Sequence, residues 1–129
     1  MIYLDSCILI YAVEDFGERG ERVRAALSEE QRPVAVSPLV AHECMVGPYR
    51  MRDLELRDHY LELLERLESV QFGLDVFLRA SELRATTGLR TPDALHLAAA
   101  QHAGCEALWT NDRRFAKSSR GMAVNLFEV

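Results

Sequence analysis

The sequence predicts an α/β protein: a three-layer α/β/α sandwich around a mostly parallel sheet of about five short strands. Two observations support this fold class. Short apolar runs alternate along the chain with helical segments, which is the pattern of successive βαβ units. The 129 residues, 49% of them hydrophobic, suit one domain with its own core, so we expect residues 1–129 to form a single domain.

The N-terminal third should hold two strands and two helices. The apolar run Ile2–Leu4 is expected to be the first strand, and Ser6 is a good N-cap for a short helix over Cys7–Val13. A charged helix over Glu18–Ser28 carries an apolar stripe among its glutamates and arginines. Pro33–Val36 is expected to be the second strand.

The middle of the chain should hold three helices and one strand. Ser37 followed by a proline predicts the start of a helix, and the Gly-Pro pair after Val46 predicts its end. The segment Asp53–Leu67 is amphipathic, with leucines at helical spacing expected to face inward. Ser69–Phe72 is expected to be the third strand and Asp75–Thr86 the next helix.

The stretch that begins at Thr91 organises the C-terminal part. Thr91 is a good N-cap, a proline is tolerated in the first turn, and the helix dipole favours an anion such as Asp93 there. Leucines and an alanine run make the helix Thr91–Ala103 apolar nearly all round, so it should be buried. The remaining elements are a strand, a helical turn and a last strand, at Ala107–Trp109, Arg113–Phe115 and Ala123–Leu126.

Hydropathy, cysteine content and charge limit where the protein acts. No apolar run approaches the ~20 residues of a membrane span, and the N-terminus lacks the basic start of a signal peptide. Three cysteines are an odd number in a chain without a secretion signal, which favours reduced thiols and the cytoplasm. A net charge of −5 argues against a general nucleic-acid coat, although carboxylates that hold cations would account for part of it.

Four acids lie at strand ends or in apolar segments, away from the charged surface runs. Asp5 ends the first strand and Asp112 follows the fourth; Glu43 lies in an uncharged stretch and Asp93 begins the buried helix. In parallel sheets, ligands bind at the carboxyl ends of the strands. Two carboxylates ~4 Å apart repel by about 4 kcal/mol at an effective dielectric near 20, so a cluster needs protons or cations. Carboxylate ligands suit Mg²⁺ or Mn²⁺, and such ions support phosphodiester hydrolysis.

Each acid also has an ordinary structural explanation, and these alternatives stay open. Asp5 could be a loop acid before a helix, and Glu43 could pair with an arginine or be exposed. Asp93 and Asp112 could act only at the starts of helices, as a dipole partner and a cap. Their shared placement at strand ends is what favours a common site.

Four segments of the chain match a known family in order: YLDSCILIY at 3–11, SPLVAHE at 37–43, TPDALHLAAAQHAG at 91–104 and WTNDRRF at 109–115. They resemble the PIN-domain family and, within it, the VapC-type toxins of bacterial toxin–antitoxin pairs. The resemblance implies a Mg²⁺- or Mn²⁺-dependent endoribonuclease that hydrolyses RNA, is inhibited by a cognate antitoxin and forms a homodimer. By position, the family's catalytic and metal-binding set falls on Asp5, Glu43, Asp93 and Asp112.

Further residues flank these acids. By resemblance, Ser6 stands where the family has a hydroxyl residue beside the site, Asn111 precedes the last acid, and Cys7 replaces a common Asn. His96, one turn after Asp93 on the same helix face, could orient that acid or a water, or could pack as a core histidine. Basic residues beside the last acid either contact RNA phosphates or are simply solvated: Arg113, Arg114 and Lys117.

Two other functions account for parts of the sequence. A degenerate PIN-like module would bind RNA or a protein partner without cleavage, but the complete set of acids argues against it. An aspartyl-phosphate receiver or phosphatase would need paired acids near the first strand and a lysine on a late strand. Asp5 stands alone there and Lys117 is the only lysine, which disfavours this second alternative.

Overall fold

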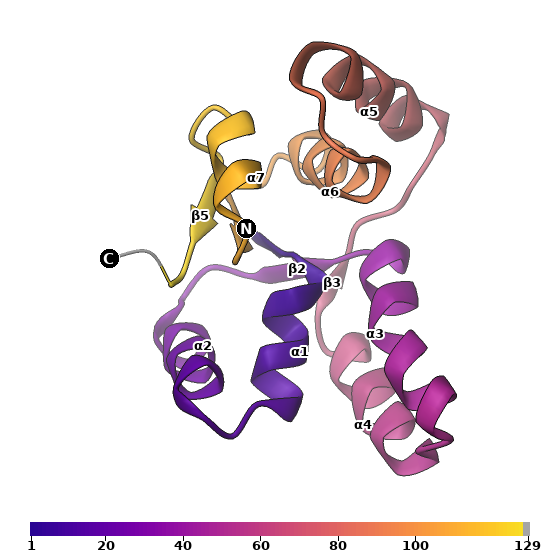
Figure 1. The fold of residues 1–129 in the computed structure, drawn as a ribbon, viewed down its shortest axis with the longest axis vertical. Helices are drawn as coiled ribbons and strands as arrows, with labels where there is room; N and C mark the ends of the chain where they lie inside the picture. The colour runs from indigo at the N-terminus through magenta and orange to yellow at the C-terminus, as the bar shows by residue number, and fades with distance from the viewer. Residues whose placement is uncertain (128–129) are drawn as a thin grey trace.

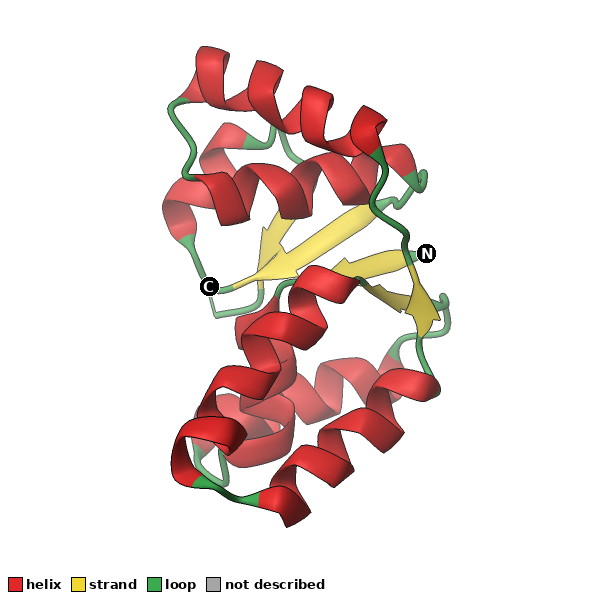
Figure 2. Cartoon of the chain, turned by 90° about the vertical axis from the view of Figure 1, so that its right-hand side faces the viewer, coloured by secondary structure: helices red, strands yellow, loops and turns green. Residues whose placement is uncertain are grey.

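The computed structural model describes residues 1–127, which form one sheet covered by helices on both sides (Figures 1 and 2). All strand pairings are parallel, and the order across the sheet is β3-β2-β1-β4-β5. The strands are β1 Ile2–Leu4, β2 Val34–Val36, β3 Glu68–Ser69, β4 Ala107–Thr110 and β5 Ala123–Asn125. The expected α/β/α sandwich with five short strands is therefore confirmed.

The helices form two layers, one on each side of the sheet. In Figure 1, α1 to α4 lie on one side of the strands and α5 to α7 on the other. None of the helices within residues 1–127 is long and apolar enough to cross a membrane. The first layer holds α1 Ser6–Glu14, α2 Glu18–Glu29, α3 Pro38–Met51 and α4 Leu54–Glu65; the second holds α5 Leu74–Thr87, α6 Thr91–His102 and α7 Arg113–Ser118.

The core lies against both faces of the central strands. The three residues of β1 and Leu108 of β4 are at most 1% exposed, because each strand is covered by a helix layer on both sides. Helix α6 is buried as expected, with residues 94–100 all inaccessible or nearly so. Its alanines have small side chains, so the sheet and α5 can approach closely. This packing fixes the N-terminus of α6, where Asp93 lies.

Helix α3 begins as expected but continues further. The Ser37 hydroxyl accepts a hydrogen bond of 3.3 Å from the backbone N–H of Val40, which confirms its N-cap role. The expected end at the Gly-Pro pair is wrong, because the helix runs through Pro48 to Met51. Pro48 is buried, so its packing compensates for the backbone hydrogen bond that proline cannot make. The helix ends at Arg52, whose φ of +54° is left-handed.

Three expected boundaries need correction. Helices α1 and α6 begin at Ser6 and Thr91 themselves, so both residues are the first of their helix and not N-caps. The preceding residues, Asp5 and Arg90, take the N-cap positions, and neither caps its helix through its side chain within the described residues. The third strand is Glu68–Ser69, not Ser69–Phe72, because pairing with β2 places the ladder earlier on this exposed edge.

The direction in which successive strands are added across the sheet reverses between β1 and β4, and this point positions the site. After β1 the chain passes through α1 and α2 to β2, on one side of β1 in the sheet. After β4 it passes through α7 to β5, on the other side. Helices that leave two adjacent strands on opposite faces open a crevice at the carboxyl ends of those strands, where ligands bind in open α/β sheets.

Candidate active site

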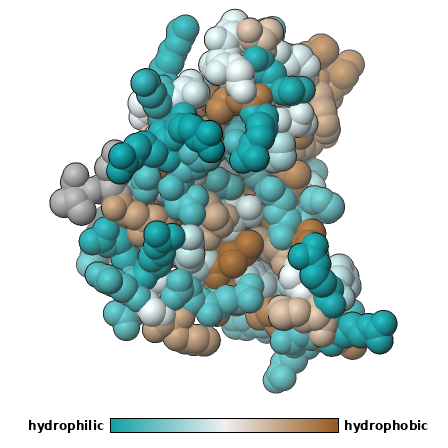
Figure 3. Space-filling model, in the orientation of Figure 1, coloured by the Kyte–Doolittle hydropathy of each residue, from teal (hydrophilic) through white to brown (hydrophobic). Residues whose placement is uncertain are grey.

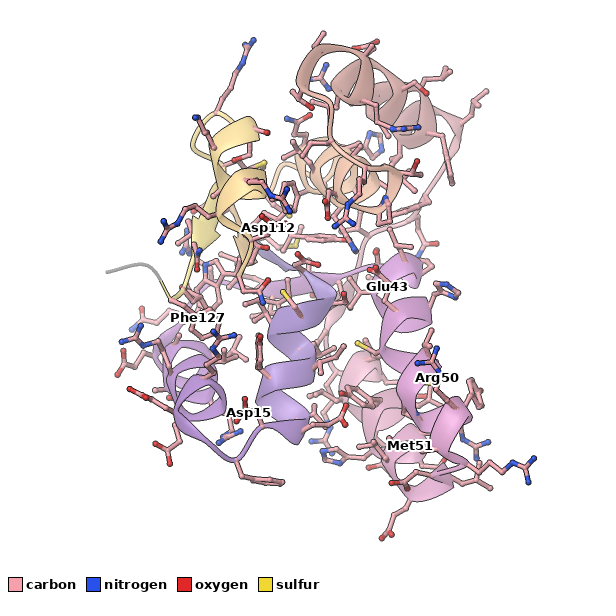
Figure 4. All side chains as sticks on the ribbon, in the orientation of Figure 1. Asp15, Glu43, Arg50, Met51, Asp112 and Phe127 are labelled. Atoms are coloured by element: carbon pink, nitrogen blue, oxygen red, sulfur yellow. The ribbon has the colours of Figure 1, made fainter. Side chains whose placement is uncertain are left out.

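The four acids come from four different elements that converge on the carboxyl ends of β1 and β4. Asp5 directly follows β1, and Asp112 lies two residues after β4. Glu43 projects from α3 and Asp93 from the first turn of α6. Figure 4 shows Glu43 and Asp112 on opposite sides of the N-terminal end of α1. The carboxyl ends of these two strands are therefore flanked by carboxylates from four elements.

Asp5 is held by the last residue of β4. It is buried, and its Oδ2 accepts a hydrogen bond of 2.9 Å from the hydroxyl of Thr110, a residue with no exposed surface. The same hydroxyl oxygen accepts a bond of 3.2 Å from the backbone N–H of Asp112. Thr110 therefore connects two of the acids and fixes how the chain leaves β4.

Asp112 caps α7, so the ordinary explanation of this acid is correct as far as it goes. Its Oδ1 accepts hydrogen bonds from the backbone N–H groups of Arg114, at 2.9 Å, and Phe115, at 3.3 Å. These bonds use one carboxylate oxygen. Capping therefore orients the side chain and is compatible with a further role for the other oxygen.

Glu43 pairs with His96, and not with the arginine that the ordinary explanation would require. Its Oε1 lies 2.5 Å from Nε2 of His96, and that nitrogen is also 3.7 Å from Oδ1 of Asp5. Burial alone would raise the pKa of Glu43. The hydrogen bond from His96, helped by the Ser6 hydroxyl, outweighs burial and holds that pKa below its usual value. Glu43 is thus kept as a carboxylate.

The surroundings of Asp93 disfavour its charged form. Its pKa is raised first by burial and then by the negative charge of Asp5, with Asp112 adding to the effect. Arg90 opposes this shift from 4.0 Å, but it is largely exposed and its effect is screened by solvent. The negative charges of Asp5 and Asp112 thus both act on Asp93. A bound cation would relieve this repulsion.

These donors fit a hard divalent cation. One oxygen of Asp5 and one of Asp112 are engaged by the protein, which leaves lone pairs of both carboxylates for an ion. Asp5, Glu43 and His96 offer ligand atoms that lie within 4.8 Å of one another. Carboxylate-rich sites of this kind suit Mg²⁺ or Mn²⁺ better than softer metals.

The model of the PIN domain matches residues 2–120 of the chain. The chain belongs to the PIN-domain family. A search of curated protein sequences gave no match.

Solved PIN-fold structures of similar shape come from toxin–antitoxin systems. A toxin–antitoxin complex from Klebsiella pneumoniae has a chain with a TM-score of 0.83 and 25% identity, matched over 100% of both chains. VapBC2 from Rickettsia felis, bound to a promoter DNA fragment, matches at 0.79 and 23%, over 97% of this chain and 98% of that one. VapC20 of Mycobacterium tuberculosis, a toxin that cleaves the sarcin–ricin loop, matches at 0.76 and 15%, over 92% and 95%. The two latter likenesses show the fold alone.

A pocket of about 410 Å³ opens beside the acids of this PIN fold. Asp93 and Asp112 line it, together with three basic side chains, those of Arg90, Arg114 and Lys117. The sequence pointed to Arg114 and Lys117 but missed Arg90, which precedes α6 and lies far from the other two in the chain. The loop of residues 88–90 lies beside α7, and this contact between distant segments brings all three side chains to one pocket.

The remaining expected site residues divide into those near the acids and those that point elsewhere. Ser6 is buried at the start of α1, near Glu43. The Asn111 side chain donates a 3.1 Å hydrogen bond to the hydroxyl of Tyr11, so it is tied to α1. Arg113 is exposed and, among the described residues, is not part of the pocket lining. His96 lies in the core, one of the two alternatives for this residue; it contacts Glu43, and no hydrogen bond within residues 1–127 joins it to Asp93.

Proposed function

We propose that this protein is a Mg²⁺- or Mn²⁺-dependent endoribonuclease, the toxin of a toxin–antitoxin pair that a cognate antitoxin inhibits. One observation carries the proposal: four acids come from the elements around the carboxyl ends of β1 and β4 in a PIN fold, and burial, followed by the charges of Asp5 and Asp112, raises the pKa of Asp93. Repelling carboxylates cost stability unless a cation neutralises them, so the cluster is best explained as a cation site. Its four members are Asp5, Glu43, Asp93 and Asp112.

The roles of the acids follow from how each is held. A divalent ion at this site would activate a water molecule and stabilise negative charge on a phosphoryl oxygen. Asp5 and Asp112 are oriented by Thr110 and by the backbone of α7, so they are rigid parts of the site. Glu43 is held ionised by His96. The charged form of Asp93 is disfavoured by burial and by Asp5, so a cation would stabilise it.

RNA is the substrate that the pocket supports best. Arg90, Arg114 and Lys117 face the same 410 Å³ pocket as two of the acids, so a phosphate there would meet both positive charge and the cation site. The chain as a whole carries a charge of −5. Three basic side chains beside two of the acids suit local recognition of a strand, and the negative net charge does not suit general coating of nucleic acid.

An antitoxin and a second copy of the chain are the proposed protein partners. The solved relatives include toxin–antitoxin complexes, and an apolar pocket of about 350 Å³ here is lined by residues of α1, α2 and α4. Figure 3 shows hydrophobic surface over α1. Leu74, Phe77 and Leu78 expose another apolar face on α5, which supports the proposed homodimer. All three cysteines are free, as in the reducing cytoplasm where we expect the protein to act.

Cleavage of RNA in the presence and absence of metal tests the proposal. Wild type should cleave total cellular RNA with Mn²⁺ or Mg²⁺ and stop when EDTA is added. Asp93→Asn should abolish cleavage while the protein stays folded by circular dichroism. Asp75→Asn is the matched control, because Asp75 also lies in the first turn of a helix in the same layer but is exposed. Equal cleavage by wild type and Asp93→Asn would refute the proposed site.

The degenerate module is the other outcome of this experiment. Wild type that binds metal and RNA but cleaves neither total RNA nor the RNA of cells in which it is expressed would be a binding module. Growth arrest on expression, lost in Asp93→Asn, would instead point to an enzyme with a narrow substrate requirement.

A further inference from the structure

A continuous hydrogen-bond network links buried side chains to the acid cluster. The Ser37 hydroxyl lies 2.7 Å from the hydroxyl of Tyr3, which lies 2.7 Å from Nδ1 of His96. Nε2 of the same histidine lies 2.5 Å from Oε1 of Glu43. Tyr3, Ser37 and His96 are at most 2% exposed, whereas the Glu43 side chain reaches the solvent-accessible side of the site. The hydrogen-bond network therefore connects the protein interior to one of the acids.

This hydrogen-bond network joins elements from both helix layers. Tyr3 lies on β1, two residues before Asp5, so the strand periodicity directs both side chains to the same face. Ser37 follows the neighbouring strand β2 and caps α3, which also carries Glu43. His96 lies on α6, in the opposite layer. Glu43 is thus held from across the sheet by a side chain whose position is fixed in the core.

One arrangement of protons gives every donor and acceptor of this hydrogen-bond network a partner. A glutamate carboxylate only accepts, so Nε2 of His96 carries the proton between them, and Nδ1 of the neutral ring is then an acceptor. A tyrosine hydroxyl carries one proton, and that of Tyr3 is donated to Nδ1. The Tyr3 oxygen accepts from Ser37, whose own oxygen accepts the backbone N–H of Val40.

The reverse arrangement fails at Ser37. If Nε2 were a metal ligand, Nδ1 would carry the proton and donate to Tyr3, and Tyr3 would donate to Ser37. The Ser37 oxygen would then accept two hydrogen bonds, and its own proton would have no acceptor among the hydrogen bonds of residues 1–127. A buried polar hydrogen without a partner is unfavourable. The proximity of Asp5, Glu43 and His96 is therefore better explained by a histidine that donates than by one that ligates.

We propose that Tyr3 and Ser37 fix His96 as its Nε2–H tautomer, and that His96 thereby positions the Glu43 carboxylate for the cation without binding the cation itself. This inference rests on the proposed function, since the cation is the one proposed to serve RNA cleavage. Glutamate has three rotatable side-chain bonds, so without this donor its carboxylate would be free to turn away from Asp5. His96 is a positioning residue, and Tyr3 positions it in turn.

Tyr3→Phe is the most direct test, because it removes one hydroxyl and leaves the ring in the core. Partners that orient metal ligands typically contribute 10–100-fold to metal affinity, so we expect Mn²⁺ binding, measured by calorimetry, to weaken by about that factor. Tyr60→Phe is the matched control: Tyr60 is equally buried, but its hydroxyl bonds to Glu14, away from the cluster. It should leave Mn²⁺ affinity unchanged.

A second pair of variants keeps the test independent of folding defects in Tyr3→Phe. His96→Gln retains an amide N–H that can donate to Glu43, and His96→Leu does not. The glutamine variant should therefore keep more of the Mn²⁺ affinity than the leucine variant. If both lose it equally, the donor role is wrong.

Long-range ¹H–¹⁵N spectra of the imidazole rings give a readout that a purely structural role would not change. His96 should show a protonated Nε2 and an unprotonated Nδ1 in wild type, with and without Mg²⁺, and this pattern should be lost in Tyr3→Phe. An unprotonated Nε2 on Mg²⁺ addition, or Mn²⁺ affinity in Tyr3→Phe equal to wild type, would overturn the inference alone. Absence of Mn²⁺ binding by wild type would overturn the proposed function itself.

Discussion

Thr110 provides a sharp test of how the site is built, because one hydroxyl serves two acids. Its Oγ1 donates to Oδ2 of Asp5 at 2.9 Å and accepts the backbone N–H of Asp112 at 3.2 Å. Thr110→Val keeps the shape of the side chain and removes both bonds. A hydrogen bond to a charged group contributes about 1.5–3 kcal/mol, and a buried donor left unsatisfied costs about 1–3 kcal/mol. Because Asp112 is partly exposed and can recruit water, we expect a total loss of about 2–4 kcal/mol.

Thermal unfolding in EDTA measures this loss without any contribution from metal. For a chain of this size, 1 kcal/mol corresponds to a shift in Tm of about 4 °C, so Thr110→Val should unfold roughly 8–16 °C below wild type. Mn²⁺ affinity should also fall about tenfold, because Asp5 loses the partner that orients it. Thr86→Val is the control, since the Thr86 hydroxyl on exposed α5 only returns to its own helix. Wild-type Tm and Mn²⁺ affinity in Thr110→Val would refute this description of the site.

Two further predictions concern the pH dependence of the metal-free protein. Burial, and then the charge of Asp5, raises the pKa of Asp93 above its unfolded value, so stability falls as pH rises through the folded pKa. Asp93→Asn should therefore unfold at a higher temperature than wild type near neutral pH in EDTA, and the difference should vanish in acid. Burial also acts to raise the pKa of Glu43, but the hydrogen bond from His96 outweighs it, and the net pKa is lowered. The Glu43 carboxylate therefore stabilises the fold at neutral pH, and this contribution is lost as pH falls. Glu43→Gln should unfold at a lower temperature than wild type near neutral pH; changes of the same sign in both variants would contradict the assignment.

Much of the fold could be predicted because its central elements are apolar throughout. The residues of β1 and β4 are buried on both faces, and a short apolar run is the sequence signal for such strands. The edge strand β3 has no such signal, since Glu68 and Ser69 are both exposed. Its place is set by pairing with β2, a long-range contact that local sequence does not encode.

Helix boundaries were less predictable for a different reason. Pro48 normally ends a helix, but here it lies buried inside α3, and tertiary packing decides the outcome. Ser6 and Thr91 have good N-cap side chains, yet the strand and the loop before them lead into the helix one residue earlier. Propensity identifies the neighbourhood of a helix start, and the geometry of the preceding chain sets the residue.

The acids could be located from sequence because strand ends and apolar segments mark them, but their partners could not. The sequence left His96 either as a core histidine or as a partner of Asp93; it lies in the core, and its contact with Glu43 on a helix from the other layer was not foreseen. Tyr3 was taken only as a strand residue, although its position two residues before Asp5 placed it on the face of the site. Arg90 lines the pocket with Arg114 and Lys117 only because the loop of residues 88–90 folds beside α7. Contacts between distant segments are what a single sequence conceals.

The central claim is that four carboxylates at the carboxyl ends of β1 and β4 form one divalent-cation site. Titration calorimetry of the wild-type protein with Mn²⁺ tests it most directly, alongside Asp5→Asn, Asp93→Asn and the control Asp75→Asn. We expect saturable binding by wild type and by the control, and at least tenfold weaker binding by both site variants. No saturable binding by wild type, or affinity unchanged by the loss of Asp5 and Asp93, would contradict the claim.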